Sequence, residues 1–325
     1  MSDSWRPTAT RAMLEQRALA LARVRGFFGA RGVLEVDTPI VVNSPVTDVH
    51  IHSAEVRFPD AAMRGEAALF FLHTSPEFAM KRLLAAGSGD IYQICHVARG
   101  LERGRHHNAE FTLIEWYRAG FPLEQLMDEV EALARDVLGP RAAAMGSERL
   151  TYRDAFQREL QIDPFTCTLE ALKAAAREIG FEAQESARDE LLELLMGARI
   201  GPRLGKNALT FIHRYPASQA ALARLDPSDP RCALRFELYC EGIELANGFH
   251  ELASSDEQRA RFEQDRQERA LRGLPTHALD ENLISALAAG LPDAAGVALG
   301  FDRLLMLATG ASHIDEVLAF PIERA

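Results

Sequence analysis

Apolar residues near the start of the chain recur at steps of three and four positions, the spacing of one helical face. This pattern predicts a helix over residues 10–31, which Gly32 would end. A short strand is expected at 33–37, before Pro39 stops it. The apolar positions of the helix are Leu14, Ala18, Leu21, Val24 and Phe28.

The same pattern predicts the later elements. A helix is expected at 76–86, because Ser75-Pro76-Glu77 offers a serine N-cap and a proline suited to the first helical position. Two strands at 91–98 and 108–117 flank a polar hairpin loop. The remaining predicted elements are a helix at 122–138, a linker at 139–150, a mostly helical insertion at about 151–205, strands at 208–213 and 233–250, helices at 255–272 and 280–290, a strand at 296–300 and a helix from 302 to about 309.

These strands and helices follow one another without a regular βαβ alternation. The order favours an α+β fold, with a mainly antiparallel sheet flanked by helices, over a doubly wound parallel sheet. The 325 residues are enough to bury a sizeable core, and no internal repeat divides them.

Composition and charge narrow the class of protein. Apolar residues make up 47% and charged residues 26%, as in ordinary soluble globular proteins. The net charge of −11 argues against broad binding of nucleic acid, which requires a basic surface. No apolar run is long enough to span a membrane, and the first residues lack a signal peptide, so a cytoplasmic location is expected. The four cysteines form no CxxC pair, which indicates reduced thiols rather than a metal site.

The hairpin at 91–117 carries the first group of chemically notable residues. If 107–117 is a regular strand, the side chains of His107, Phe111, Glu115 and Tyr117 share one face. Arg99 ends the preceding strand, and its guanidinium suits phosphate or carboxylate binding. The alternative is an ordinary, half-exposed hairpin.

A second group lies in the strand pair at 235–251. If Glu241-Gly242 is a two-residue turn, Tyr239 pairs with Glu244. Glu237 and Glu244 then become diagonal neighbours on one face. Two such carboxylates repel unless a cation lies between them, and Mg²⁺ bound together with nucleotide phosphates fits this need. Two solvated glutamates are the alternative.

The same strand pair leaves one register question open. Asn247-Gly248 could form a β-bulge, which would change the face on which Glu251 appears.

A third group lies at 296–307, where an apolar strand meets a helix at Gly300. Arg303 falls in the first helical turn, where a cation opposes the helix dipole and anionic ligands are favoured. A contact with a phosphate group would explain why an arginine lies at this position. The alternative is a partner carboxylate such as Asp302.

In this order, the three groups resemble the class II aminoacyl-tRNA synthetases over nearly the whole chain. GVLEVDTP, which ends at Pro39, is similar to motif 1, the dimer interface of that family. The hairpin with Arg99, His107 and Phe111 resembles motif 2, and GVALGFDR resembles motif 3. TSPEFAMKRLL, HNAEFTLIEWY and GIELANGFHEL are similar to the lysyl enzymes in detail.

Only about ten residues precede the first helix, which leaves no room for the anticodon-binding barrel of a lysyl-tRNA synthetase. A stand-alone lysyl core of this length resembles the family of elongation factor P lysine ligases. Lysyl-tRNA synthetases carry glycine at the position of Ala298, and the alanine in this chain is a further resemblance to the elongation factor P lysine ligases. The resemblance implies one catalytic domain over 1–325, a homodimer, and no stable binding of tRNA. It also implies adenylation of a lysine-type amino acid, with (R)-β-lysine preferred, and its transfer to a lysine of elongation factor P.

The resemblance also implies a role for each matching residue. Arg99 and Arg303 would be the catalytic residues that bind ATP phosphates, with Mg²⁺ on Glu237 and Glu244. Glu77 and Glu251 would pair with the side-chain ammonium of the substrate. The other ATP-binding residues would be Glu102, His107, Phe111, Glu244, Leu245 and Gly300, and the other substrate-binding residues would be Ser75, Tyr117, Asn247, Phe249 and Ala298.

The chain departs from the family at motif 2. Leu101 stands where a glutamate is usual, and Glu102 is one position further on. Ala98 replaces a phenylalanine, and His96 replaces an arginine. The loop also holds Arg103, Arg105 and His106, which either meet an acidic acceptor protein or form a variable, solvated loop.

Two other hypotheses remain open. One is a synthetase-like core with a different acceptor or amino acid, against which the acidic pair Glu77 and Glu251 argues. The other is a non-catalytic regulatory paralogue, which the altered motif 2 favours and the retained Arg99 and Arg303 oppose.

Overall fold

The computed structural model describes residues 5–58, 68–100, 102–182 and 186–325, so the expectation for Leu101 lies outside the described residues. The chain divides into two compact units. The first comprises Met1–Phe121, Asp136–Leu138 and Ala253–Ala325, and the second comprises Pro122–Arg135 and Gly139–Leu252.

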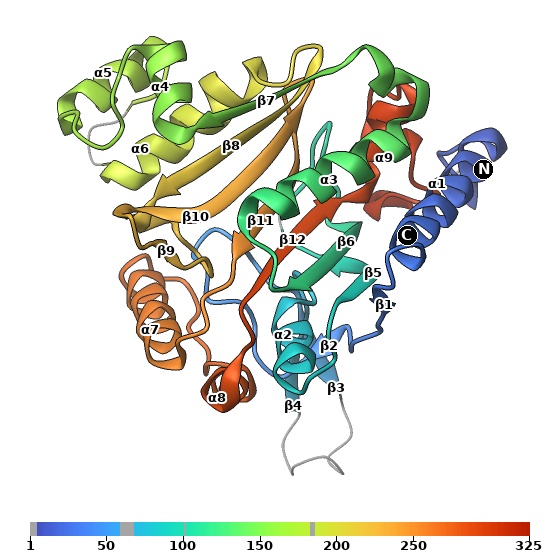
Figure 1. Ribbon diagram of the computed structural model, residues 1–325, viewed down its shortest axis with the longest axis horizontal. Helices are drawn as coiled ribbons and strands as arrows, with labels where there is room; N and C mark the ends of the chain where they lie inside the picture. The colour runs from blue at the N-terminus through green and yellow to red at the C-terminus, as the bar shows by residue number, and fades with distance from the viewer. Residues whose placement is uncertain (1–4, 59–67, 101, 183–185) are drawn as a thin grey trace. The chain divides into compact units, whose positions relative to one another are not determined.

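The first unit contains a sheet in the order β1-β5-β6-β12 (Figure 1). β1 runs parallel to β5, and the other two pairings are antiparallel. A small antiparallel sheet in the order β2-β4-β3 lies apart from it. The strands are β1 (Leu34–Glu35), β2 (Val41–Val42), β3 (Glu55–Phe58), β4 (Ala68–Leu72), β5 (Ile91–Ala98), β6 (Glu110–Ala119) and β12 (Ala294–Gly300). The helices are α1 (Arg11–Gly29), α2 (Glu77–Ala85), α7 (Ser255–Leu271), α8 (Glu281–Gly290) and α9 (Phe301–Thr309).

The two faces of the first sheet have different environments. On one face, the ring of Phe28 from α1 stacks on Tyr92 with centroids 4.3 Å apart and meets the edge of Trp116 at 5.3 Å. These aromatic contacts bury the apolar side of α1, whose N-terminus is capped by the Thr10 hydroxyl. The opposite face carries Glu115 and Tyr117, because side chains alternate along β6.

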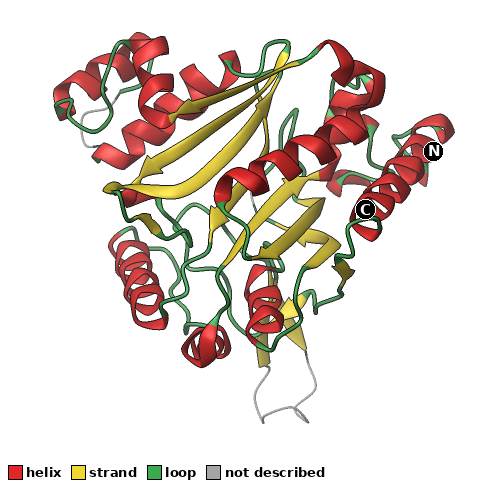
Figure 2. Ribbon diagram, in the orientation of Figure 1, coloured by secondary structure: helices red, strands yellow, loops and turns green. Residues whose placement is uncertain are grey.

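Within the second unit the strand order is β11-β10-β8-β7, with the short β9 paired to β10. Only β7 and β8 run parallel. Figure 2 shows helices α4 to α6 gathered beside these strands, where they enclose a core that includes Tyr152, Phe156 and Leu192. The elements are α3 (Leu123–Leu138), β7 (Gly146–Thr151), α4 (Tyr152–Leu160), α5 (Leu169–Glu178), α6 (Arg188–Leu195), β8 (Ala208–Pro216), β9 (Leu225–Asp226), β10 (Asp229–Cys240) and β11 (Ile243–His250).

The fold class expected from the sequence is confirmed. Both units combine helices with mostly antiparallel strands, and the segment at about 151–205 is helical as predicted. The linker predicted at 139–150 is wrong, because this segment holds a short 3₁₀ helix, Gly139–Ala144, and strand β7. β7 is polar and half-exposed, and its pairing with β8 rather than an apolar pattern makes it a strand.

Helix α2 also begins one residue later than predicted. Its N-cap is Pro76 rather than Ser75, and the Ser75 hydroxyl accepts a hydrogen bond from the Glu77 amide at 3.0 Å. Among the described residues, no helix combines the length and apolar character that a membrane span requires.

Candidate active site

The β5–β6 hairpin places Arg99 and Phe111 together in the first unit. The guanidinium carbon of Arg99 lies 5.2 Å from the centroid of the Phe111 ring, and its Nε donates to the Thr74 carbonyl at 3.3 Å. An arginine held over an aromatic ring forms a flat, cationic surface. This pair is therefore suited to a planar, anionic ligand.

His107 does not belong to the strand that was predicted for it. β6 begins only at Glu110, and the backbone of His107 pairs instead with Gly104 across the loop, at 3.1 and 3.2 Å. Desolvation and the cationic neighbours Arg303, His106 and Arg99 lower the pKa of His107 to about 4. The ring is therefore neutral at neutral pH.

Arg303 lies in the first turn of α9, three residues after the N-cap Gly300, as predicted. Its Nε donates to the His106 carbonyl at 3.1 Å, and one of its terminal nitrogens lies 2.6 Å from Nε2 of His107. Because the neutral imidazole can accept there, these two predicted ATP-binding residues hold each other in place.

The alternative partner of Arg303, Asp302, has other contacts. Its carboxylate accepts from Arg17 of α1 at 2.5 Å and from the Thr112 amide at 2.7 Å. Asp302 is almost fully buried, and Arg17 supplies the compensating charge. The hypothesis that Asp302 neutralises Arg303 is therefore wrong, and Arg17 is a structural residue whose role the sequence did not indicate.

Glu115 forms the centre of the polar face of the first sheet. Its two carboxylate oxygens accept from the Ser75 hydroxyl at 2.7 Å and from the Tyr117 hydroxyl at 2.8 Å. Ala298 of β12 lies directly opposite Glu115 in the register. Sequence reasoning put Glu115 on this face without giving it a role, although a buried carboxylate between Ser75 and Tyr117 is a natural cation site.

Glu77 already has a cationic neighbour in this structure. The ammonium of Lys81, one helical turn later, lies 2.7 Å from the Glu77 carboxylate and is 1% exposed. A lysine buried this completely requires a carboxylate partner. The predicted pairing of Glu77 with a substrate ammonium must therefore share this carboxylate with Lys81, a residue that sequence reasoning passed over within TSPEFAMKRLL.

In the second unit, the hairpin of β10 and β11 has the predicted turn and register. Tyr239 pairs with Glu244 across the turn at Glu241-Gly242. The irregularity lies at Leu238/Tyr239, where Leu245 is the extra residue on β11. The predicted bulge at Asn247-Gly248 is wrong, since these two residues keep a regular register with Glu237 and Phe236.

This register places Glu237, Glu244 and Asn247 on one face of the hairpin. Glu237 is 7% exposed and accepts from Arg235 at 2.5 Å and from the Tyr239 hydroxyl at 2.7 Å. The alternative of solvated glutamates is therefore wrong for Glu237. Its hydrogen bonds leave lone pairs that suit a divalent cation, although among the described residues no three acidic, histidine or cysteine side chains cluster tightly enough to form a metal site.

Two of the remaining predicted residues, Leu245 in this hairpin and Glu251 just after it, are buried. Leu245 is 2% exposed, and Phe249 pairs with Arg235 in the register. Glu251 is 3% exposed, and its backbone bridges to Ala223. In the first unit, Glu102 is half-buried within the loop between β5 and β6.

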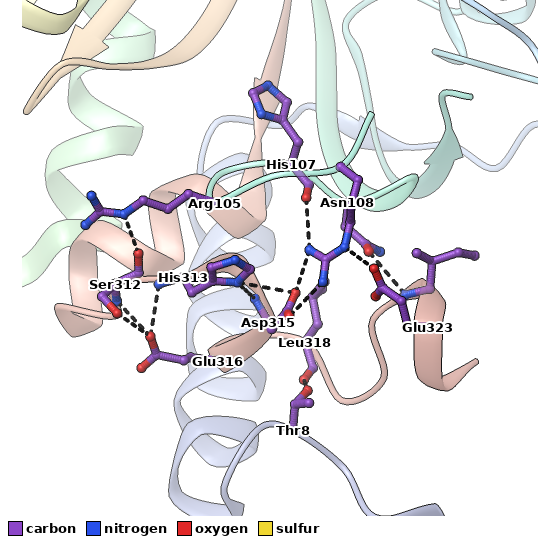
Figure 3. Close-up of polar contacts among 12 residues, drawn as sticks. Thr8, Arg105, His107, Asn108, Ser312, His313, Asp315, Glu316, Leu318 and Glu323 are labelled. Carbon is purple, nitrogen blue, oxygen red and sulfur yellow. Dashed lines mark hydrogen bonds and ion pairs between the residues drawn. The ribbon is translucent and has the colours of Figure 1, made fainter. Parts of the chain in front are cut away.

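The hairpin loop of the first unit is bound to the end of the chain (Figure 3). Arg103 makes a bidentate contact with Asp315, at 2.9 and 2.8 Å, and a further hydrogen bond to Glu323 at 2.5 Å. Arg105 donates through Nε to the Ser312 carbonyl at 2.7 Å. Arg103 is therefore engaged by carboxylates of the first unit itself.

Backbone contacts strengthen the same connection. The Ile314 amide donates to the Arg105 carbonyl at 2.9 Å, and the Ile322 amide donates to the Asn108 side chain at 3.1 Å. Thr8 joins from the other end of the chain by donating to the Leu318 carbonyl at 2.8 Å. We call residues 312–325 the C-terminal segment, which supports the loop that carries His107.

In both its fold and its side chains, the first unit has the features of a class II aminoacyl-tRNA synthetase catalytic core. An antiparallel sheet carries an arginine over an aromatic ring at one strand end and a second arginine at a strand-to-helix junction. The sequence model of the family "tRNA synthetases class II (D, K and N)" matches residues 3–324.

Individual relatives narrow this assignment. A Photobacterium profundum protein named elongation factor P–(R)-beta-lysine ligase is 49% identical over 328 residues, which cover 100% of both chains. Proteins of that name from Vibrio parahaemolyticus and Salmonella dublin are 50% and 48% identical, over 99% of this chain and 99% and 98% of their own. The chain therefore belongs to the class II synthetase family and, within it, to the group of elongation factor P–(R)-β-lysine ligases, which are ATP-dependent ligases.

Proposed function

We propose that this ligase adenylates a lysine-type amino acid, (R)-β-lysine above all, and transfers it to a lysine side chain of elongation factor P. The observation that carries the proposal is the full-length identity of 48–50% to relatives named for this reaction. The buried carboxylate of Glu115, which suits a cationic substrate, supports it independently. A different acceptor or amino acid, and a regulatory role without catalysis, become outcomes of the test.

In the first step, a carboxylate oxygen of the amino acid attacks the α-phosphorus of ATP, and the bond to the pyrophosphate oxygen breaks. Arg99 and Arg303 are proposed to bind the phosphates, with His107 on the pyrophosphate side and Phe111 under the adenine. Positioning and neutralisation of charge supply the catalysis, and no protein nucleophile is required. Mg²⁺ held by Glu237 and Glu244 would neutralise phosphate charge.

In the second step, the unprotonated amine of the acceptor lysine attacks the carbonyl carbon of the adenylate. The carbon–oxygen bond to AMP breaks, an amide forms, and the amine gives up its proton. The thiol of Cys95 lies on the same sheet face as Glu115, but burial raises its pKa to about 12. A thiol that stays protonated is a poor nucleophile, which favours direct transfer from the adenylate.

The amino-acid pocket completes the proposal. Glu77 and Glu251 would bind the substrate's side-chain ammonium, with Glu77 released in part from Lys81. Ser75, Tyr117 and Ala298 are proposed to line the pocket, together with Asn247 and Phe249. Glu102, Leu245 and Gly300 are proposed to complete the ATP-binding set.

The remaining proposals concern the protein as a whole. We propose one catalytic domain over 1–325 with a helical insertion at about 151–205, a cytoplasmic location, a homodimer through the motif 1 region, and no stable tRNA complex. Leu34 of β1 supports the dimer, because it lies in that region and is 56% exposed at the edge of the first sheet.

ATP–pyrophosphate exchange tests the first step directly. Purified protein with Mg²⁺ is expected to exchange with (R)-β-lysine and, more weakly, α-lysine, but not with ornithine, arginine, aspartate or buffer alone. Incubation with ATP, (R)-β-lysine and elongation factor P is then expected to increase the acceptor's mass by one lysyl group. Exchange with another amino acid would replace the substrate, and no exchange from folded protein would favour the regulatory paralogue.

A further inference from the structure

Gln93 lies in the middle of the polar face of the first sheet. In the register, Glu115 lies directly opposite it on β6, and Ala298 of β12 lies on the other side of Glu115. Directly opposed side chains point to the same face of an antiparallel sheet. Gln93, Glu115 and Ala298 therefore form one row across three strands, on the face that also holds Tyr117.

The carboxamide of Gln93 is buried without a proper partner. The side chain is 1% exposed, and within the described parts of the chain neither its Nε2 nor its Oε1 makes a hydrogen bond. The Cys95 thiol, two residues further along the strand, interacts with the Gln93 side chain, but sulfur is only a weak hydrogen-bonding group and this contact does not satisfy the amide. A buried amide left unpaired is costly, so it requires an explanation.

The neighbouring groups indicate what kind of ligand would satisfy this amide. Each oxygen of the Glu115 carboxylate accepts one hydrogen bond, from Ser75 and from Tyr117, which leaves one lone pair on each oxygen for a bound cation. An ammonium group has three donors and no acceptor. The Oε1 of Gln93 is a neutral acceptor in the same row, and it adds no second buried charge beside Glu115.

We propose that Gln93 is a specificity-determining residue of the amino-acid pocket, whose Oε1 accepts a hydrogen bond from an ammonium group of the substrate beside Glu115. This inference rests on the proposed function and names a residue of its pocket. The Nε2 of Gln93 would donate to water bound with the substrate. The unpaired amide of the free protein is then a group held ready for the ligand.

The Gln93→Met variant tests the inference, because it keeps the length of the side chain and removes both polar atoms. In ATP–pyrophosphate exchange, the KM for (R)-β-lysine is expected to rise about 10- to 100-fold, the loss of one hydrogen bond to a charged group. The KM for ATP is expected to stay within about 2-fold. The Tm of the free protein is expected to hold or rise, because an unpaired buried amide is removed.

The melting temperature separates this role from a structural one. If Gln93 only supported the fold, Gln93→Met would lower the Tm and affect both substrates alike, and that result would overturn the inference. An unchanged KM for the amino acid would overturn it as well. Gln125→Met, the same change at an exposed position of α3, is the matched control and should alter neither constant.

A charged variant adds a second, independent measurement. Gln93→Glu keeps an acceptor but places a second carboxylate beside Glu115, so the pH dependence of the KM for the amino acid should change while that of ATP does not. A pH profile identical to that of the wild type contradicts the inference. If the wild type itself shows no exchange with any lysine-type substrate, the proposed function fails and this inference fails with it. Wild-type exchange with an unaffected Gln93→Met overturns the inference alone.

Discussion

The ring of His107 illustrates how neighbours set the chemistry of a single residue. Desolvation and the charges of Arg303, His106 and Arg99 lower its pKa to about 4, while an unfolded chain would have the ordinary value near 6.5. As the pH falls from 6.5 towards 4, the imidazole of His107 binds a proton in the unfolded chain but not in the folded protein. The contribution of His107 to the free energy of unfolding is therefore fully present above about pH 6.5 and is lost as the pH falls from 6.5 towards 4.

We expect NMR titration of the free protein to show a histidine of pKa about 4 whose signal is absent from His107→Asn. Inorganic pyrophosphate should raise this pKa, because phosphate charge favours the protonated ring. A His107 signal that titrates near 6.5 before ligand is added, or that ignores pyrophosphate, would contradict its assigned surroundings.

Arg17 and Asp302 provide a second prediction at the residue scale. Asp302 is 2% exposed at its side chain, and its ion pair with Arg17 compensates a buried charge. Arg17→Met is expected to lower the free energy of unfolding in urea by about 3 kcal/mol, because it leaves that carboxylate without its cation. Arg11→Met on the same helix removes only an exposed pair with Glu15, so its loss should stay below about 0.5 kcal/mol. Equal losses in the two variants would show that Arg17 does not compensate the buried charge of Asp302.

At the scale of elements, the C-terminal segment holds the hairpin loop through a network rather than a single contact. Arg103 reaches both Asp315 and Glu323, and the Arg105 carbonyl accepts from the Ile314 amide. Exposed ion pairs are individually weak, but one that joins two segments fixes the loop's position. Since the same loop carries His107, the network is expected to orient the ring for which we propose a role in phosphate binding.

Arg103→Met tests this positioning role. We expect the KM for ATP to rise about 3- to 10-fold, with little change in the KM for the amino acid and a small change in Tm. The matched control is Arg259→Met, which breaks an exposed bidentate pair with Glu281 on other helices. The positioning role is rejected if both variants behave alike, or if Arg103→Met raises both Michaelis constants equally.

For the whole molecule, the proposed homodimer gives a measurable mass. The chain mass is 35.9 kDa, so sedimentation should give about twice this value at micromolar concentration. Leu34→Asp introduces a charge at the exposed edge of β1 and is expected to shift the protein toward monomer. Leu169→Asp, at an exposed leucine of α5, should leave the mass unchanged. A wild-type monomer under these conditions would refute the dimer.

The sequence by itself determined most elements and part of the site. Apolar spacing placed α1 and the helical segment at about 151–205, and alternation placed β5 and β6. The turn at Glu241-Gly242 set the pairing of Tyr239 with Glu244. These features depend on neighbours in the chain, since local periodicity and turn geometry are written in consecutive residues.

Only the tertiary structure decided which charged groups meet. Lys81 lies against Glu77, Arg17 reaches Asp302, and Arg103 reaches Asp315, and no sequence pattern distinguishes these pairs from others of the same charge. The strand β7 and the bulge at Leu245 likewise follow from pairing with a neighbouring strand. Side-chain partners, burial and pKa shifts all depend on distances between segments remote in sequence. Those distances are fixed only when the sheets and helices pack, because packing decides which polar groups lose water and must find one another.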